Sequence, residues 1–258
     1  MKRHLFVLFG IVVLIGLKTG QVSLGQTIPI QAPPNTGEFI IQTVIKRAKE
    51  SDLVKREKLT YKRIYTAHNL NDNEQIIDPQ RPEREEVVII EYGGKERVIK
   101  KNKNGRPVNL GNVSTPRFDL INALEAVAKL DNFEINRIEM FEGRPNYVIN
   151  FKPKPGPRPD GDVEDVIVRS EGVMYVDIEK FYIKKFSAWM VRPYSRGGIF
   201  GWNIFNLTRA NIEMAQEEFN DIVVMSSVVI TDKYSLFGGD TFEKQTYTYG
   251  DYRQVQPR

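Results

Sequence analysis

FEINRIEMFEGRPNYVINFKPKPG, residues 133–156, contains two runs of alternating apolar and polar side chains on either side of Glu142–Gly143. Alternation with a period of two places successive side chains on opposite faces of a β-strand. A glycine-containing pair between two such runs favours a tight turn. The stretch is therefore predicted to be a β-hairpin, and residues 171–193, EGVMYVDIEKFYIKKFSAWMVRP, are predicted to form a second hairpin that turns near Ile178–Lys180.

Most of the remaining chain also has strand character. Further strands are predicted within residues 57–70, 85–94, 96–110, 208–221, 222–235 and 240–253. Apolar side chains at helical spacing predict two helices, near residues 38–50 and 117–130. The proline- and glycine-rich residues 151–165 are predicted to be a long surface connection. The expected fold class is α+β and mainly β, with a strongly curved antiparallel sheet and two covering helices.

The N-terminal residues 1–25 have the pattern of a cleaved signal peptide. Basic residues come first, an apolar run extends from Leu5 to Leu17, and the small residues Ser23 and Gly25 stand where signal peptidase cleaves. The run is shorter than the roughly 20 apolar residues of a membrane-spanning helix. An uncleaved N-terminal anchor is the alternative. We expect secretion into the periplasm.

Residues 26–37 are predicted to be a proline-containing linker, and residues 38–258 a single domain. The chain has no cysteine, so no disulfide can staple it and its core must hold it together. The three basic residues of the signal peptide leave with no acidic residue, and the mature chain is then almost uncharged overall. Since a nucleic-acid-binding protein needs a basic stripe to displace counterions, we expect no nucleic-acid partner.

Few residues are suited to catalysis. His68 would be the single histidine of the mature chain, and it lies beside a polar turn. A Ser–His–Asp site is therefore not expected, and zinc sites of the His/Cys kind are excluded. The acidic segments 72–74 and 160–165 match no calcium loop and are predicted to be solvated turns. A glycosidase pair of carboxylates stays open, although no pair is marked out. We expect no enzyme, no metal site and no cofactor.

Two motifs resemble a known family. Gly143–Pro155 follows the pattern G-R-P-x-Y-x-x-x-F-x-P-K-P, and Gly172–Phe186 follows G-x-x-x-x-D-x-E-x-x-x-I-x-K-F. A VRP motif, a glycine–aromatic loop and SVVITDKYSLFGGDTFEKQTYTYGDYR (residues 227–253) come next. This order is similar to that of the LolA-like superfamily of periplasmic lipoprotein-sorting and lipoprotein-carrier proteins. The resemblance covers about residues 59–253.

The resemblance implies an incomplete antiparallel barrel with a helical lid and an apolar interior that accepts lipid or lipoprotein acyl chains. Large apolar side chains that alternate on the predicted strands are candidates for lining such a cavity. These candidates are Val87, Ile89, Tyr147, Ile149, Phe151, Phe181, Ile183 and Trp189. An ordinary packed core is the alternative. The protein would then be a non-enzymatic envelope scaffold that docks a protein partner, such as an outer-membrane or secretion component.

The glycine-rich loop SRGGIFGWNIFN, residues 195–206, is unusually apolar for a surface connection. Its candidate contact residues are Ile199, Phe200, Trp202, Ile204 and Phe205. They either fold back and plug the open end of the sheet, or project and make a transient contact with a membrane or a protein partner. The sequence leaves both arrangements open.

Overall fold

The computed structural model describes residues 36–109, 118–197 and 203–255, with only the backbone at residues 203 and 204. Asn35–Arg258 form one compact unit. The predicted signal peptide and nearly all of the predicted linker lie outside the described residues.

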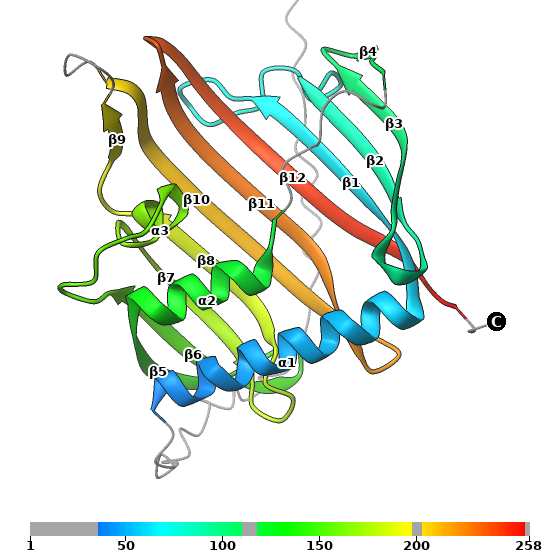
Figure 1. The fold of residues 1–258 in the computed structure, drawn as a ribbon, viewed down its shortest axis with the longest axis vertical. Coiled ribbons are helices and arrows are strands. Elements are labelled where there is room, and N and C mark those ends of the chain that lie inside the picture. Colours follow the sequence, from blue (N-terminus) through cyan, green and yellow to red (C-terminus); the bar gives the residue numbers. More distant parts are fainter. Residues whose placement is uncertain (1–35, 110–117, 198–202, 256–258) are drawn as a thin grey trace, which may run out of the picture. The chain divides into compact units, whose positions relative to one another are not determined.

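The described residues form one antiparallel sheet of 12 strands with three helices (Figure 1). The helices are α1 (Gly37–Lys58), α2 (Leu120–Leu130) and α3 (Asp162–Ile167), with a short 3₁₀ turn η1 (Tyr92–Gly94). The strands are β1 (Leu59–Asn69), β2 (Arg84–Ile90), β3 (Glu96–Lys103), β4 (Arg106–Pro107), β5 (Asp131–Phe141), β6 (Arg144–Pro153), β7 (Ser170–Asp177), β8 (Ile183–Met190), β9 (Tyr194–Gly197), β10 (Asn203–Phe219), β11 (Ile222–Leu236) and β12 (Gly239–Gln254).

The strand order is β4-β3-β2-β1-β12-β11-β10-β8-β7-β6-β5, with β9 paired to β10. The two ends of this order, β4 and β5, are not paired with each other, so the sheet does not close into a barrel. The predicted fold class is confirmed. One helix was missed, because α3 lies in the stretch that its prolines and glycines marked as a connection. Its first turn contains Asp162, Glu164 and Asp165, whose charges suit the N-terminal end of a helix.

One face of the sheet carries a continuous row of apolar side chains. Each member of the row is the register partner of the next, from β6 to β1: Ile149, Met174, Phe186, Met214, Val228, Tyr247 and Tyr65. All of them are buried in the same core cluster as the inward residues of α1 and α2. The helices therefore cover this face, which we call the helix-covered face (Figure 1).

The same face becomes charged beyond β1. Tyr65 is the register partner of Glu86 on β2, and Glu86 is the partner of Lys101 on β3. Arg84 on β2 lies 2.7 Å from the carboxylate of Glu243 on β12. The helix-covered face thus runs from apolar at β6 to ion-paired at β2 and β3.

Asp131 joins α2 directly to β5 without a loop. Its side chain is fully buried, and neither carboxylate oxygen has a hydrogen-bond partner among the described residues. Burial raises the pKa of this carboxyl to about 7, although the nearby Lys154 ammonium acts in the opposite direction. At neutral pH the folded protein therefore holds an acid that ionises only with difficulty.

We expect Asp131→Asn to change the pH dependence of stability. The unfolded chain loses this proton near pH 4, whereas the folded chain loses it near pH 7. The native free energy of unfolding therefore falls as pH rises from about 4 to about 7 and stays low above that. The asparagine side chain cannot ionise. The change that the substitution makes in the free energy of unfolding should therefore be about 2–4 kcal/mol more favourable at pH 8 than at pH 4. Urea unfolding at both pH values measures this, and an equal effect at both would contradict it.

Phe237 occupies an unfavourable position in the turn between β11 and β12. Leu236 and Gly239 close the hairpin, and the two turn residues Phe237 and Gly238 have φ values of +50° and +82°. Two positive φ values are typical of a type I′ turn, which favours asparagine at its first central position. A bulky side chain seldom adopts this conformation, and the ring of Phe237 is 78% exposed.

We expect Phe237→Asn to raise the free energy of unfolding by about 0.5–1 kcal/mol, because asparagine tolerates the left-handed conformation. Phe237→Ser is the matched control, since it removes the same ring without supplying this preference. Chemical denaturation should give the asparagine variant a higher free energy of unfolding than the serine variant. A less stable asparagine variant would contradict the turn assignment.

Candidate functional site

A pocket of about 580 Å³ lies between the helix-covered face of the sheet and the helices α2 and α3. Almost all of its lining is apolar. The floor is formed by Phe151, Phe186, Ala188, Leu207 and Ile212, and the roof by Leu124, Val127, Val166 and Ile167. We call this space the apolar pocket.

Small residues in the sheet make room for this pocket. Gly172 on β7 and Ala188 on β8 are register partners on the helix-covered face. The ring of Phe151 lies over Gly172, where a Cβ would overlap that ring and the carbonyl oxygen of Ser187. Phe151 in turn stacks on Phe186, with ring centroids 5.2 Å apart and planes inclined by 16°. The floor is therefore low at Ala188, whereas the Phe151 ring covers Gly172.

Polar groups gather at one end of the apolar pocket. The Tyr194 hydroxyl donates a hydrogen bond of 2.8 Å to Asp162 Oδ1, and Arg196 Nη1 donates one of 2.8 Å to Asp162 Oδ2. Asp162 and Arg196 are both largely exposed to solvent. These contacts connect α3 to β9 and place the polar end of the pocket at the surface.

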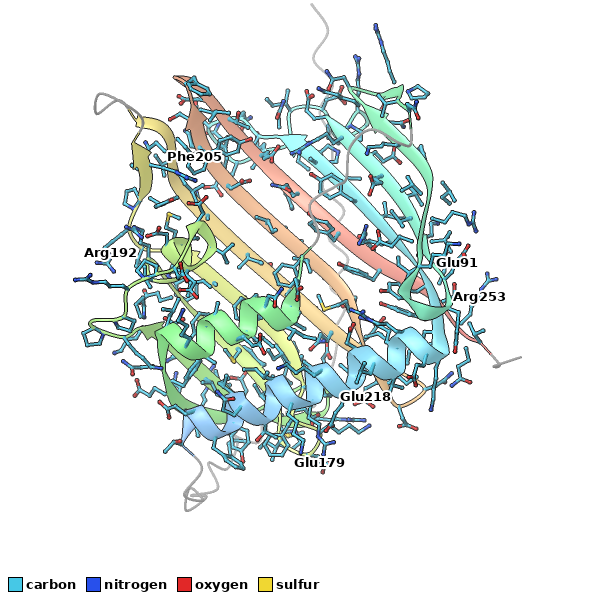
Figure 2. The ribbon with its side chains drawn as sticks, in the orientation of Figure 1. Glu91, Glu179, Arg192, Phe205, Glu218 and Arg253 are labelled. Atoms are coloured by element: carbon cyan, nitrogen blue, oxygen red, sulfur yellow. The ribbon has the colours of Figure 1, made fainter. Side chains whose placement is uncertain are left out.

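Phe205 also lines the apolar pocket. It lies near the β9 end of β10 (Figure 2), with its ring centroid 6.2 Å from that of Tyr194 and 5.7 Å from that of Tyr234. Of the predicted loop residues, Phe205 is thus packed against the sheet. Ile199, Phe200 and Trp202 lie outside the described residues, as does the side chain of Ile204.

A second pocket of about 850 Å³ lies between α1, the start of α2, and strands β1, β11 and β12. Its lining is mixed. Apolar residues such as Val44, Ile183 and Met225 alternate with charged and hydroxyl-bearing ones. The second pocket shares three wall residues with the apolar pocket: Phe118, Leu120 and Leu124. The two spaces therefore adjoin at the first turns of α2.

The structure disperses the residues predicted to line a cavity. Phe151 lines the apolar pocket, and Ile183 lines the second pocket. Ile149 is fully buried in the core beneath the helices. Tyr147 and Phe181 pack against the same core and line neither pocket.

Three predicted residues face away from both pockets. Val87 and Ile89 alternate with Glu86 and therefore lie on the opposite face of the sheet. Trp189 follows Ala188, which lines the apolar pocket, and is 41% exposed on that opposite face. The prediction that these three residues line a cavity is wrong.

A β-bulge explains the error at Trp189. Tyr175 pairs with Lys185, but the next residue, Val176, pairs with Ile183, so Lys184 has no register partner. One extra residue reverses the alternation along a strand. Ile183 and Ala188 consequently both face the helices, although simple alternation separates them. The β-branched run of β2 has apolar side chains on both faces of the sheet. Only the pairing of β2 with β1 decides which of these side chains lie on the helix-covered face.

Several of the pocket residues that the sequence analysis missed are small or lie on α3. Ala188 lines the pocket because it leaves space, which no hydrophobic pattern signals. Val166 and Ile167 belong to the six-residue helix within a segment rich in turn formers. Phe186 had a usable signal, since it lies within the family-like motif.

The described residues offer no metal site of three or more His, Cys, Asp and Glu side chains. In the acidic turn at 72–74, Glu74 is paired with Arg209 and Asp72 with Lys233. None of the helices within the described ranges is long and apolar enough to cross a membrane.

No protein-family profile and no curated protein sequence matches the chain. Solved structures match it at low identity. An outer-membrane lipoprotein-sorting protein domain from Vibrio parahaemolyticus is 10% identical, with a TM-score of 0.30 over 83% of this chain and 93% of that one. A DUF1329 family protein from Desulfovibrio piger is 9% identical, with a TM-score of 0.31 over 83% and 92% of the two chains.

The MucA/MucB complex of Pseudomonas aeruginosa also matches, at 9% identity and a TM-score of 0.25 over 84% of this chain and 99% of the other. A lipoprotein-sorting domain thus stands among the similar structures, as the sequence motifs predicted. At these TM-scores the likeness supports no inference about ligand or activity.

We expect Gly172→Ala to destabilise the protein by about 2 kcal/mol or more, because overpacking a core forces side chains and backbone to shift. The added methyl group would collide with a backbone oxygen that cannot move away and with the Phe151 ring. Gly250→Ala on β12 is the matched control, since a Cβ there meets no atom within 4 Å. Thermal and urea unfolding of both variants measure the difference, and equal losses would contradict the close approach at Gly172.

Proposed function

We propose that this protein is a periplasmic carrier or binding protein that holds the acyl chain of a lipid or lipoprotein reversibly in the apolar pocket. The observation that supports this most strongly is the pocket itself. Its volume of about 580 Å³ lies within the range of about 300–1,000 Å³ that is usual for ligand sites. Its nearly uniform apolar lining suits a hydrocarbon chain better than a polar metabolite.

The mechanism is passive. Transfer of an acyl chain from water into the pocket stabilises the complex by about 0.8 kcal/mol for each buried CH₂ group, before the cost of ordering the chain. Release needs only an acceptor that buries the chain better. The helices α2 and α3 form the roof, so an outward movement of either one would open the pocket. No bond is broken in this cycle, which agrees with the expectation of a protein that is not an enzyme.

A second candidate function is a non-enzymatic interaction module of the cell envelope. The exposed Leu236 and Phe237 at the β11–β12 turn favour it, since they are 48% and 78% exposed in adjacent positions. Leu236 is the register partner of Phe205, which lines the apolar pocket. A protein partner or a membrane surface that covered this turn would therefore lie close to the pocket.

Filling the pocket should abolish lipid binding. We expect native mass spectrometry of the wild-type protein, mixed with phospholipid, to show a lipid-bound species. Ala188→Trp places a large ring on the pocket floor and should lower the bound fraction at least tenfold, since the space for the chain is lost. Ser187→Trp is the matched control, because the neighbouring side chain lies on the opposite face of the sheet.

Equal lipid binding by the two tryptophan variants would contradict the apolar pocket as the site. A wild-type protein that binds no lipid would contradict the carrier function. Capture of an envelope protein that depends on Phe237 would then support the interaction module.

A further inference from the structure

Asp131 lies where the roof of the apolar pocket joins the sheet. It follows Leu130, the last residue of α2, and is the first residue of β5, so helix and strand meet without a loop. Its backbone N–H donates to the carbonyl oxygen of Val127 in the last turn of α2. Leu124 and Val127 of the same helix line the pocket. A movement of α2 away from the sheet therefore has to move Asp131 as well.

The side chain of Asp131 lies on the helix-covered face of the sheet. It shares this face with Phe133, which stands two residues further along β5 and belongs to the buried core cluster. Asp131 is 0% exposed, and neither carboxylate oxygen has a hydrogen-bond partner among the described residues. A buried carboxylate without partners costs far more free energy than a neutral carboxyl group in the same place. The closed roof therefore favours the protonated side chain.

Lys154, which follows β6, fastens the end of α2 and leaves the carboxyl group without an ion pair. Its backbone N–H donates to the carbonyl oxygen of Leu130 at 2.8 Å. Its Nζ atom donates to the carbonyl oxygens of Ala128 and Lys129 at 3.2 and 3.4 Å. The Lys154 ammonium lowers the pKa of Asp131, but burial outweighs it and raises this pKa to about 7.

Other charges on the packed helices do not compensate for the carboxylate. Glu38 lies in the first turn of α1, and Lys129 on α2 pairs with Glu164 on α3 at 2.7 Å. None of these three groups changes the pKa of Asp131. A negative charge at the C-terminal end of α2 also meets the negative end of the helix dipole. Ionisation of Asp131 therefore opposes the docking of this helix.

We infer that α2 closes over the apolar pocket with the carboxyl group of Asp131 protonated, and lifts from the sheet when this group ionises. In water the carboxyl group loses its proton near pH 4, and beneath the closed roof near pH 7. Between these values the closed state binds more protons than the lifted state. The ratio of lifted to closed molecules therefore rises about tenfold for each pH unit, and levels off above about pH 7.

A consequence for ligand exchange follows, and it rests on the proposed function. A bound acyl chain should leave faster at pH 6 than at pH 5, because the roof is lifted more often. The coupling between α2 and the proton does not itself require a ligand.

Amide hydrogen exchange of the wild-type protein tests the coupling. After correction for the intrinsic exchange rates, protection of the α2 amides gives the equilibrium constant for opening. This constant should rise about tenfold from pH 5 to pH 6, and at both pH values it should exceed the constant for the central strand β11, which reports global unfolding. An α2 constant that does not change with pH would overturn the inference. An α2 constant equal to that of β11 would also overturn it.

Three variants separate Asp131 from other titrating groups. Asp131→Asn should give the same α2 opening constant at pH 5 and pH 6. Glu125→Gln is the matched control, since it removes a half-exposed carboxyl of the same helix, and it should keep the tenfold rise. Lys154→Met removes the one charge that lowers the pKa of Asp131, so its opening constant should continue to rise above pH 7. A tenfold rise in Asp131→Asn would contradict the assignment.

Release of lysophosphatidylcholine to acceptor vesicles measures the consequence for a ligand, because the charge of this lipid is constant between pH 5 and pH 8. The rate from the wild type should be about tenfold higher at pH 6 than at pH 5, and equal at both pH values for Asp131→Asn. Bound lipid with pH-independent release and pH-independent α2 exchange would overturn the coupling and leave the carrier function standing. pH-dependent α2 exchange without any lipid binding would support the coupling and overturn the carrier function.

Discussion

A wide sheet with one face to cover is the constraint from which the rest of this structure follows. The apolar row from Ile149 to Tyr65 crosses the sheet and must be shielded from water. Only α1, α2 and the short α3 are available for this among the described residues. Beneath α2 and α3, the space over Ala188 is left unfilled and belongs to the apolar pocket. Incomplete coverage by few helices therefore produces the apolar pocket.

The helix-covered face also changes character in one direction. It is apolar beneath α2 and α3, offers hydroxyl and guanidinium donors at β1 and β12, and ends in ion pairs such as Arg84–Glu243 at β2. An amphiphilic molecule has the same order of groups along its length. The two adjoining pockets follow this gradient and share a wall at Leu124.

The sequence predicted the sheet better than the site. The hairpin at Glu142–Gly143 is found as expected, because a turn-forming pair between two strand-forming runs fixes where the chain reverses. The first helix was located correctly, but it continues to Lys58, where ion pairs of Asp52 support its last turns. The cavity residues were predicted less well. The bulge at Lys184 reversed the alternation before Trp189, and a bulge of this kind is visible only when the partner strand is in place.

The amino-acid sequence by itself determined the mainly β architecture, the absence of disulfides and the scarcity of catalytic side chains. These properties depend on local alternation and on composition, which need no knowledge of distant contacts. Only the tertiary structure decided which face of the sheet the helices cover and where the floor of the apolar pocket is low. It also decided that Arg63 on β1 is the register partner of Tyr249 on β12. Those properties arise from the pairing of segments far apart in the chain. A pocket is the space that such segments leave unfilled between them.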